Sequence, residues 1–91
     1  MIVEFDKSFN KSLDKIREAS VFQKLETSIR QLEKATNLNE VNNVRKLSGF
    51  RNYYRIKIGN YRVGFEMINP DSIRIIIVAH RSSIYRHFPK K

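Results

Sequence analysis

The chain has 91 residues, a net charge of +9 and no cysteine, which predicts one small domain and excludes a disulfide framework, a thiolate metal site and thiol redox chemistry. Its apolar runs fall short of the roughly 18 residues of a membrane-spanning helix, and its acidic N-terminal residues do not fit a signal peptide. Two histidines, His80 and His87, are too few to indicate a metal site. We therefore expect a single cytoplasmic domain over residues 1–91, with no metal, no small-molecule cofactor and no membrane partner.

The positive charge is unevenly distributed along the chain. Residues 1–44 contain seven Lys or Arg and seven Asp or Glu, whereas residues 45–91 contain eleven basic and two acidic residues. The whole positive excess therefore falls in the C-terminal half. Such an asymmetry is typical of a nucleic-acid-binding surface. A basic membrane-surface helix is disfavoured, because the basic residues occur in strand-like segments rather than in an amphipathic helix.

The chain begins with a short strand and a helix. Residues 1–5 are apolar enough for a strand, but a strand this short should join a later sheet. Residues 6–18 follow helical spacing, and Asp6 or Ser8 can cap the start of this helix. The apolar positions of its stripe are Phe9, Leu13 and Ile16.

A second helix follows after a short break at residues 19–20. Ser20 and Gln23 fit a capping box, which predicts that the helix starts at Ser20. Its apolar stripe consists of Val21, Phe22, Leu25, Ile29 and Leu32. The short break predicts an antiparallel or sharply angled helix pair that packs on one apolar sheet face.

Residues 53–68 predict a β-hairpin. Two alternating runs meet at Gly59 and Asn60, a pair typical of a two-residue turn. Because side chains alternate between the faces of a strand, one face should be apolar and the other cationic. The apolar face consists of Tyr54, Ile56, Ile58, Tyr61, Val63 and Phe65. The other face consists of Tyr53, Arg55, Lys57, Arg62 and Gly64.

The predicted register sets Lys57 directly opposite Arg62. Like charges in that position destabilise a sheet, so a sequence that keeps them commonly places an anion there. The alternative interpretation is a solvated cationic face whose long side chains extend into water.

The remaining segments complete an α+β fold. Residues 36–43 form a polar loop, residues 44–48 are a candidate short strand, and residues 84–88 favour one helical turn. Residues 73–79 are β-branched and nearly continuous, which predicts a central strand buried on both faces. The predicted order is β-α-α-β-β-β, with two N-terminal helices on one face of a mainly antiparallel four-stranded sheet. The predicted core consists of Ile56, Val63, Phe65, Ile75 and Ile77 packed on Leu13, Leu25 and Ile29.

Three segments carry a family resemblance. They are KLSG at 46–49, YYRIKIGNYRVGFE at 53–66 and VAHRSSIY at 78–85. In these segments and in its layout and length, the chain resembles the RelE/ParE superfamily of toxins from bacterial and archaeal toxin–antitoxin pairs. One branch of this superfamily cuts mRNA on the ribosome, and another poisons DNA gyrase.

Resemblance to the mRNA-cutting branch implies a metal-independent endoribonuclease. In such an enzyme the 2′-hydroxyl of the RNA attacks the adjacent phosphate, and cations stabilise the developing charge. The implied catalytic residues are Arg55, Lys57, Arg62, Arg81, Tyr85 and His80. Among these, Tyr85 would stack on a base and assist proton transfer. Some RNA-cutting relatives also use a glutamate on the hairpin, but the spacing does not assign that role to Glu66.

Further basic and aromatic residues are predicted to bind RNA more generally. Arg45, Lys46 and Arg51 should attract the phosphate backbone. Tyr53 either stacks on a base or packs at the edge of the fold.

Three functions remain open from the sequence. The first is a toxin that cuts mRNA in the A site of the 70S ribosome and is neutralised by a cognate antitoxin protein; the joint presence of Arg55, Lys57, Arg62 and Tyr85 favours it. The second is a ParE-like toxin that inhibits DNA gyrase without nuclease activity. This function would be favoured if Tyr85 and Lys57 proved dispensable for toxicity. The third is a basic RNA- or ribosome-binding module without toxicity, which the absence of a neighbouring antitoxin gene would favour.

Overall fold

The computed structural model describes residues 1–89. Their helices and strands, in chain order, are β1 (Ile2–Phe5), α1 (Lys7–Leu13), α2 (Ala19–Lys34), the 3-10 helix η1 (Leu38–Glu40), β2 (Val44–Lys46), β3 (Tyr53–Ile58), β4 (Tyr61–Asn69), β5 (Ser72–His80) and α3 (Ile84–His87).

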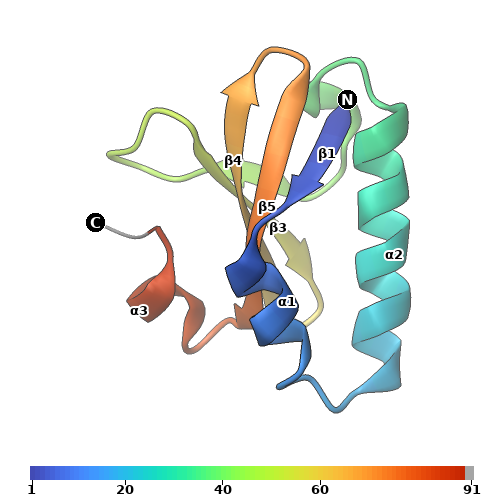
Figure 1. The fold of residues 1–91 in the computed structure, drawn as a ribbon, viewed down its shortest axis with the longest axis vertical. Helices are drawn as coiled ribbons and strands as arrows, with labels where there is room; N and C mark the ends of the chain where they lie inside the picture. Colours follow the sequence, from blue (N-terminus) through green and yellow to red (C-terminus); the bar gives the residue numbers. More distant parts are fainter. Residues whose placement is uncertain (90–91) are drawn as a thin grey trace.

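The five strands form one mixed sheet in the order β1-β5-β4-β3-β2 (Figure 1). β1 pairs with β5 in parallel, and the other neighbours are antiparallel. The predicted α+β class and the joining of the N-terminal strand to the sheet are confirmed, but the predicted four strands and element order are wrong. The strand missing from the predicted order is β2, which with three residues is too short to show a clear periodicity. β5 is an interior strand as predicted, although β4 rather than β5 occupies the middle of the sheet.

The predicted hairpin register is confirmed pair by pair. Ile58 lies opposite Tyr61, and Lys57 lies opposite Arg62. Gly59 adopts φ of 62°, a left-handed value that glycine reaches without the steric cost of a β-carbon. The turn and the alternation are both local properties, which is why the sequence predicts this register well.

A β-bulge in β5 changes which side chains reach the core. Phe65 pairs with Ile75, whereas Gly64 pairs with Ile77, so Ile76 is the extra residue. The bulge reverses the alternation, and Val78 instead of Ile77 lies in the core. The prediction of Ile77 as a core residue on the face covered by α2 is therefore wrong. The Ser8 hydroxyl of α1 donates to the carbonyl oxygen of Ile76 at 2.7 Å and satisfies the bulged backbone.

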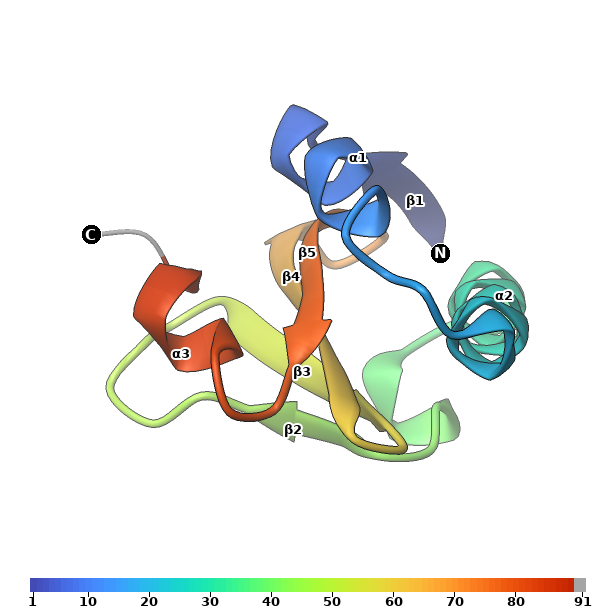
Figure 2. The same ribbon diagram turned by 90° about the horizontal axis from the view of Figure 1, so that it is seen from below.

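The helices lie on different sides of the sheet. Figure 2 shows α2 and α3 on opposite sides and α1 at the edge formed by β1 and β5. Of the two predicted capping residues, Asp6 caps α1: its carboxylate accepts from the backbone N–H of Ser8. α1 ends at Leu13, earlier than predicted. The predicted helix was too long because Ile16, which lies in the loop after α1, is also buried and therefore continues the apolar pattern.

The predicted start of the second helix at Ser20 is wrong. α2 begins at Ala19, and its N-cap residue Glu18 makes no side-chain capping hydrogen bond. Alanine is the strongest helix former, and the first turn is closed by the backbone, where Val21 N–H donates to Glu18 O at 3.1 Å. None of the helices within residues 1–89 is long and apolar enough to cross a bilayer.

The core lies between α2, α1 and one face of the sheet. Fully buried sheet residues on this face include Ile56, Val63, Phe65 and Ile75. Leu25 of α2 is also buried, and Leu13 and Ile29 pack against the cluster at partial burial. These parts of the predicted core are confirmed.

Candidate nucleic-acid interface

Four cationic side chains lie together on the sheet face opposite the core. Arg45 of β2 pairs with Arg55 of β3, and Lys57 of β3 pairs with Arg62 of β4. Directly opposite residues share a face, and so do residues two apart on one strand. We call these four residues the cation cluster. Of the four, Arg45 was expected only to attract phosphate generally, and the short strand β2 brings it into register with Arg55.

The cation cluster has no acidic partner among the described residues. Within residues 1–89, ion pairs join Arg30 to Glu26 and Arg74 to Glu4 and Glu66, and none involves the cluster. Two like-charge pairs therefore stand side by side, at a cost in stability. An arrangement of this kind is suited to a polyanionic ligand, which would relieve the repulsion.

Backbone carbonyls orient two guanidinium groups of the cluster. Arg62 Nη1 donates to the carbonyl oxygens of Gly59 and Tyr61, each at 2.9 Å. Arg55 Nη1 donates to the carbonyl oxygen of Asn43 at 3.3 Å. A guanidinium has five N–H donors, so each group keeps donors for a ligand while its position is restricted. Lys57 is exposed and can adjust to the ligand.

The C-terminal segment lies on the same face as the cation cluster. Phe88 packs on Gly64, the residue directly opposite Arg55, and a β-carbon added to Gly64 would lie 2.6 Å from Phe88 Cδ2. Phe88 and Ile84 are fully buried, which fixes α3 to the sheet. On this helix, the side chain of Tyr85 is 56% exposed. Tyr85 is therefore an exposed aromatic residue on the side of the sheet that carries the cluster.

Arg81 lies in the connection between β5 and α3. Its backbone N–H donates to the carbonyl oxygen of Asn60 at 2.8 Å, and its side chain is exposed. This hydrogen bond ties the start of the connection to the hairpin turn. Arg81 is thus near the turn between Lys57 and Arg62, but within residues 1–89 neither a hydrogen bond nor an ion pair joins it to the cluster.

His80 lies on the other face of the sheet. It pairs with Tyr61, and the two rings meet edge to face with centroids 5.4 Å apart. Its Nδ1 accepts from the backbone N–H of Ser82 at 3.1 Å and lies 2.8 Å from the Ser82 hydroxyl. The structure therefore does not bring His80 together with Lys57 and Arg62.

Tyr53 and Glu66 are opposite one another on the face of the cation cluster but outside it. The ring of Tyr53 packs between Phe50 and Phe88, with centroid distances of 5.7 and 5.4 Å. Glu66 lies 3.9 Å from Arg74, and Phe88 on Gly64 lies between it and Arg62. Tyr53 is thus placed for packing, and Glu66 is placed for an ion pair.

The remaining predicted RNA-binding residues lie at the periphery. Lys46 of the edge strand β2 pairs with Tyr54 and so lies on the sheet face opposite the cation cluster. Arg51 is exposed in the loop between β2 and β3. Residues 1–89 contain no group of three or more His, Cys, Asp or Glu that could hold a metal ion.

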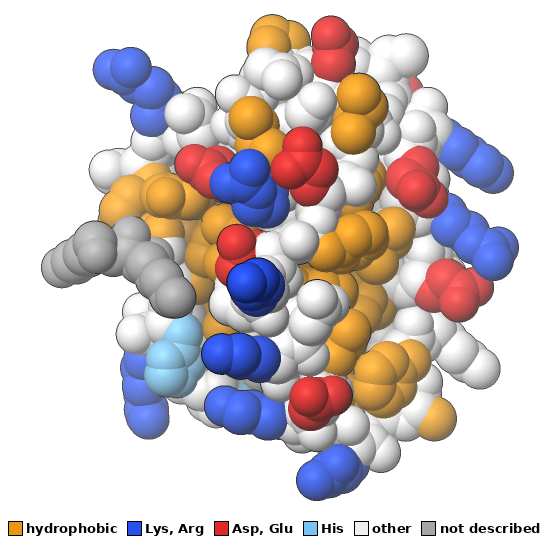
Figure 3. Space-filling model, viewed as in Figure 1, with side chains coloured by type: hydrophobic (Ala, Val, Ile, Leu, Met, Phe, Trp, Pro, Cys, Tyr) orange, Lys and Arg blue, Asp and Glu red, His pale blue; other side chains and the backbone are white. Residues whose placement is uncertain are grey.

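The face seen in Figure 3 does not show a similar concentration of one charge. Lys and Arg side chains over the helices are interspersed there with Asp and Glu, and hydrophobic side chains are exposed between α1 and α2. This mixture agrees with the neutral balance of residues 1–44. The fold and the cation cluster define a small basic α+β domain with one face suited to a polyanion.

Comparisons with known proteins identify the family. A family model described as the ParE toxin of the type II toxin–antitoxin system parDE matches residues 3–85. Toxin RelE3 of Methanocaldococcus jannaschii is 38% identical over 90 residues, which is 98% of this chain and 100% of the relative. The chain belongs to the RelE/ParE superfamily of type II toxin–antitoxin toxins.

Solved structures show the same fold. A RelB–RelE antitoxin–toxin complex from Methanococcus jannaschii matches with TM-score 0.79 and 36% identity, over 94% of this chain and 99% of the matched chain. An Escherichia coli RelE mutant in complex with an antitoxin RelBc peptide matches with TM-score 0.67 and 23% identity, over 99% and 95% of the two chains. The toxin–antitoxin complex RelBE2 of Mycobacterium tuberculosis matches with TM-score 0.57 and 15% identity, over 88% and 96%.

Proposed function

We propose that the protein is a ribosome-dependent, metal-independent endoribonuclease that cuts mRNA in the A site and so inhibits translation in the cytoplasm. The observation that carries this proposal is the cation cluster, which has no acidic partner among residues 1–89, on the same side of the sheet as the exposed Tyr85 of α3. The cluster supplies charge stabilisation, and the tyrosine supplies an aromatic ring with a hydroxyl group. Both are needed for cleavage in which the RNA provides its own nucleophile.

Each residue has a distinct role in the proposed reaction. The 2′-hydroxyl loses its proton and attacks the adjacent phosphorus, the bond to the 5′-oxygen of the next nucleotide breaks, that oxygen takes up a proton, and a 2′,3′-cyclic phosphate is left. Arg62, held by two carbonyls of the turn, is positioned to stabilise charge on the phosphate oxygens, and Lys57 can approach the same phosphate from the neighbouring strand. Tyr85 stacks on a splayed base and takes part in proton transfer.

We also propose that a cognate antitoxin neutralises the protein. The solved relatives include toxins in complex with RelB antitoxins. An acidic or amphipathic antitoxin segment would complement the charge of residues 45–91 and cover the cation cluster. Its binding should therefore weaken as salt concentration rises.

Inhibition of DNA gyrase is the second candidate function. The matching family model is that of the ParE toxin, which favours this alternative. In that case the cation cluster would bind a protein or DNA surface rather than a scissile phosphate.

Two parallel assays distinguish these functions. Purified protein is added to ribosomes programmed with a defined mRNA, and cleavage is mapped by primer extension; the same preparation is added to a gyrase supercoiling assay. The proposal predicts new 5′ ends of downstream mRNA fragments that appear only with ribosomes, and unchanged supercoiling. Inhibited supercoiling without mRNA cuts would replace the proposal with the second function.

A further inference from the structure

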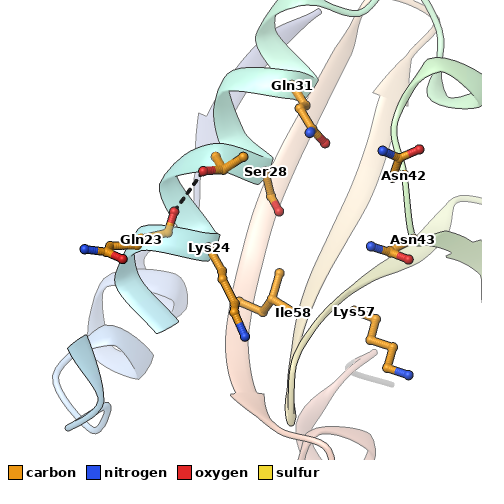
Figure 4. A pocket seen from close by; sticks show the side chains of 9 residues that line it. Gln23, Lys24, Ser28, Gln31, Asn42, Asn43, Lys57 and Ile58 are labelled. Carbon is orange, nitrogen blue, oxygen red and sulfur yellow. Dashed lines mark hydrogen bonds between the residues drawn. The ribbon is translucent and has the colours of Figure 1, made fainter. Parts of the chain in front are cut away.

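A polar groove lies between α2 on one side and, on the other, the residues just before β2 together with the end of β3. Its volume is about 400 Å³, within the range of small-molecule sites. The residues that line it are Gln23, Lys24, Thr27, Ser28, Gln31, Asn42, Asn43, Lys57 and Ile58. Figure 4 shows Gln31 and Lys24 on one wall, Asn42 and Asn43 on the opposite wall, and Ile58 and Lys57 at one end.

The chemistry of this groove suits a nucleotide. Its charged lining residues, Lys24 and Lys57, are both cationic, and among the described residues neither forms an ion pair. The amides of Gln31, Asn42 and Asn43 each present donors and an acceptor. Ammonium groups bind phosphate, and amide side chains pair with base edges.

The groove is continuous with the cation cluster through the hairpin turn. Lys57 belongs to both. Lys24 Nζ lies against the turn, 3.1 Å from the position of a β-carbon added to Gly59. The carbonyl oxygen of Gly59 in turn accepts from Arg62 at 2.9 Å. Cations from α2, β3 and β4 thus surround one turn.

The wall opposite α2 is held in place by β3, the strand that carries Arg55 and Lys57 of the cation cluster. Asn43 adopts φ of 66°, a left-handed conformation that asparagine tolerates better than most residues. Its carbonyl oxygen accepts from Lys57 N–H at 3.1 Å and from Arg55 Nη1 at 3.3 Å. The groove is therefore built on β3 and keeps a defined position relative to Arg55 and Lys57.

We propose that this groove binds a nucleotide that flanks the scissile phosphate of a single-stranded RNA. Lys24 contacts its phosphate, and the amides of Gln31 and Asn42 contact its base. This inference rests on the proposed function and adds a second subsite to it. Continuity with the cation cluster favours RNA over an acidic peptide, because one strand can then occupy both sites.

The first test measures RNA binding without cleavage. Fluorescence anisotropy follows a labelled single-stranded oligoribonucleotide, with a 2′-deoxy sugar at the scissile position, at several salt concentrations. Lys24→Gln should weaken binding about threefold to tenfold at low salt and reduce the slope of log Kd against log salt by about 0.7. Lys34→Gln is the matched control, because Lys34 is exposed on the same helix and lies outside the groove. Equal effects of the two substitutions would overturn the proposal.

The second test examines base contacts. Gln31→Ala and Asn42→Ala should change the order of affinities for four oligoribonucleotides that differ in one flanking base and leave the salt slope unchanged. An unchanged order would overturn the assignment of the amides. If a glutamate-rich peptide shifts the side-chain amide NMR signals of Gln31 and Asn42 while the oligoribonucleotide does not, the groove binds protein and the proposal is wrong.

These tests separate the inference from the proposed function. Suppose that the parent but not an Arg62→Ala variant cuts mRNA on programmed ribosomes, and that Lys24→Gln binds RNA as Lys34→Gln does. This result would support the nuclease and exclude the groove as a binding site. A parent protein that cuts no mRNA would exclude the nuclease itself, whatever the groove binds.

Discussion

A β-carbon added to Gly64 would lie 2.6 Å from Cδ2 of Phe88, so the ring of Phe88 rests directly on the backbone of the middle strand. This contact attaches α3 to the sheet face that carries the cation cluster. It anchors the helix that carries the exposed Tyr85, because Ile84, the first residue of α3, and Phe88, its C-cap residue, are both fully buried.

We predict that Gly64→Ala destabilises the fold by about 1–3 kcal/mol, because the added methyl group overpacks against Phe88. In a Phe88→Ala background, where the ring is absent, the same change should cost less than about 0.5 kcal/mol. Urea unfolding of the parent, both single variants and the double variant measures the coupling. Equal costs in the two backgrounds would show that the ring does not rest on Gly64.

Tyr85→Phe should reduce the single-turnover rate of mRNA cleavage about 10²-fold, because it removes the hydroxyl that takes part in proton transfer and keeps the ring that stacks. The side chain is exposed, so stability should not change. Tyr54→Phe is the control, since Tyr54 stacks on Phe65 in the core and should keep the parental rate. A Tyr85→Phe variant with the parental rate would remove this residue from the mechanism.

The bulge at Ile76 predicts unequal effects for two isoleucines of β5. Ile75→Ala should cost about 2–5 kcal/mol, because Ile75 is fully buried in the core. Ile77→Ala should cost less than half as much, because Ile77 lies on the other face and is partly exposed. Chemical denaturation measures both. Similar costs would indicate an unbroken alternation through residues 73–79.

Hydrogen bonds from the Thr36 hydroxyl and from the Thr36 backbone N–H lower the pKa of Glu40 below its ordinary value. A carboxyl whose pKa is lowered in the folded state stabilises the protein above its unfolded pKa and loses this contribution as pH falls through the folded pKa. Thr36→Val removes the side-chain donor and should move the pKa of Glu40 upward, toward its ordinary value. An NMR titration of the Glu40 carboxyl carbon measures it, and an unchanged midpoint would contradict the assignment.

Local signals made part of this molecule predictable from its sequence. The hairpin register follows from Gly59-Asn60 and the alternation around it, which is why the pairing of Lys57 with Arg62 was predicted correctly. The Asp6 cap and the buried positions of β3 and β4 follow from equally local patterns.

Tertiary contacts explain what the sequence did not predict. Whether β2 joins the sheet and brings Arg45 to Arg55 depends on pairing with β3 across the loop of residues 47–52. The bulge in β5 is stabilised by Ser8, a residue of α1, so alternation alone misplaced Ile77. The position of Lys24 against Gly59 depends on how α2 packs, and no local pattern reports it. A glycine within an apolar strand does signal a close approach, and this signal at Gly64 could have predicted the contact with Phe88.

The central claim is that Lys57 and Arg62 together stabilise the charge of RNA cleavage on the ribosome. The most direct test is primer extension on mRNA from a cell-free translation reaction that contains the parent, a Lys57→Ala/Arg62→Ala variant, or a Lys11→Ala/Lys34→Ala variant with the same loss of charge at exposed positions elsewhere. The account predicts ribosome-dependent cuts with the parent and the control, and a loss of at least about 10²-fold in the variant of the cation cluster. A cluster variant that remains folded by circular dichroism and cuts mRNA as the parent does would contradict the account.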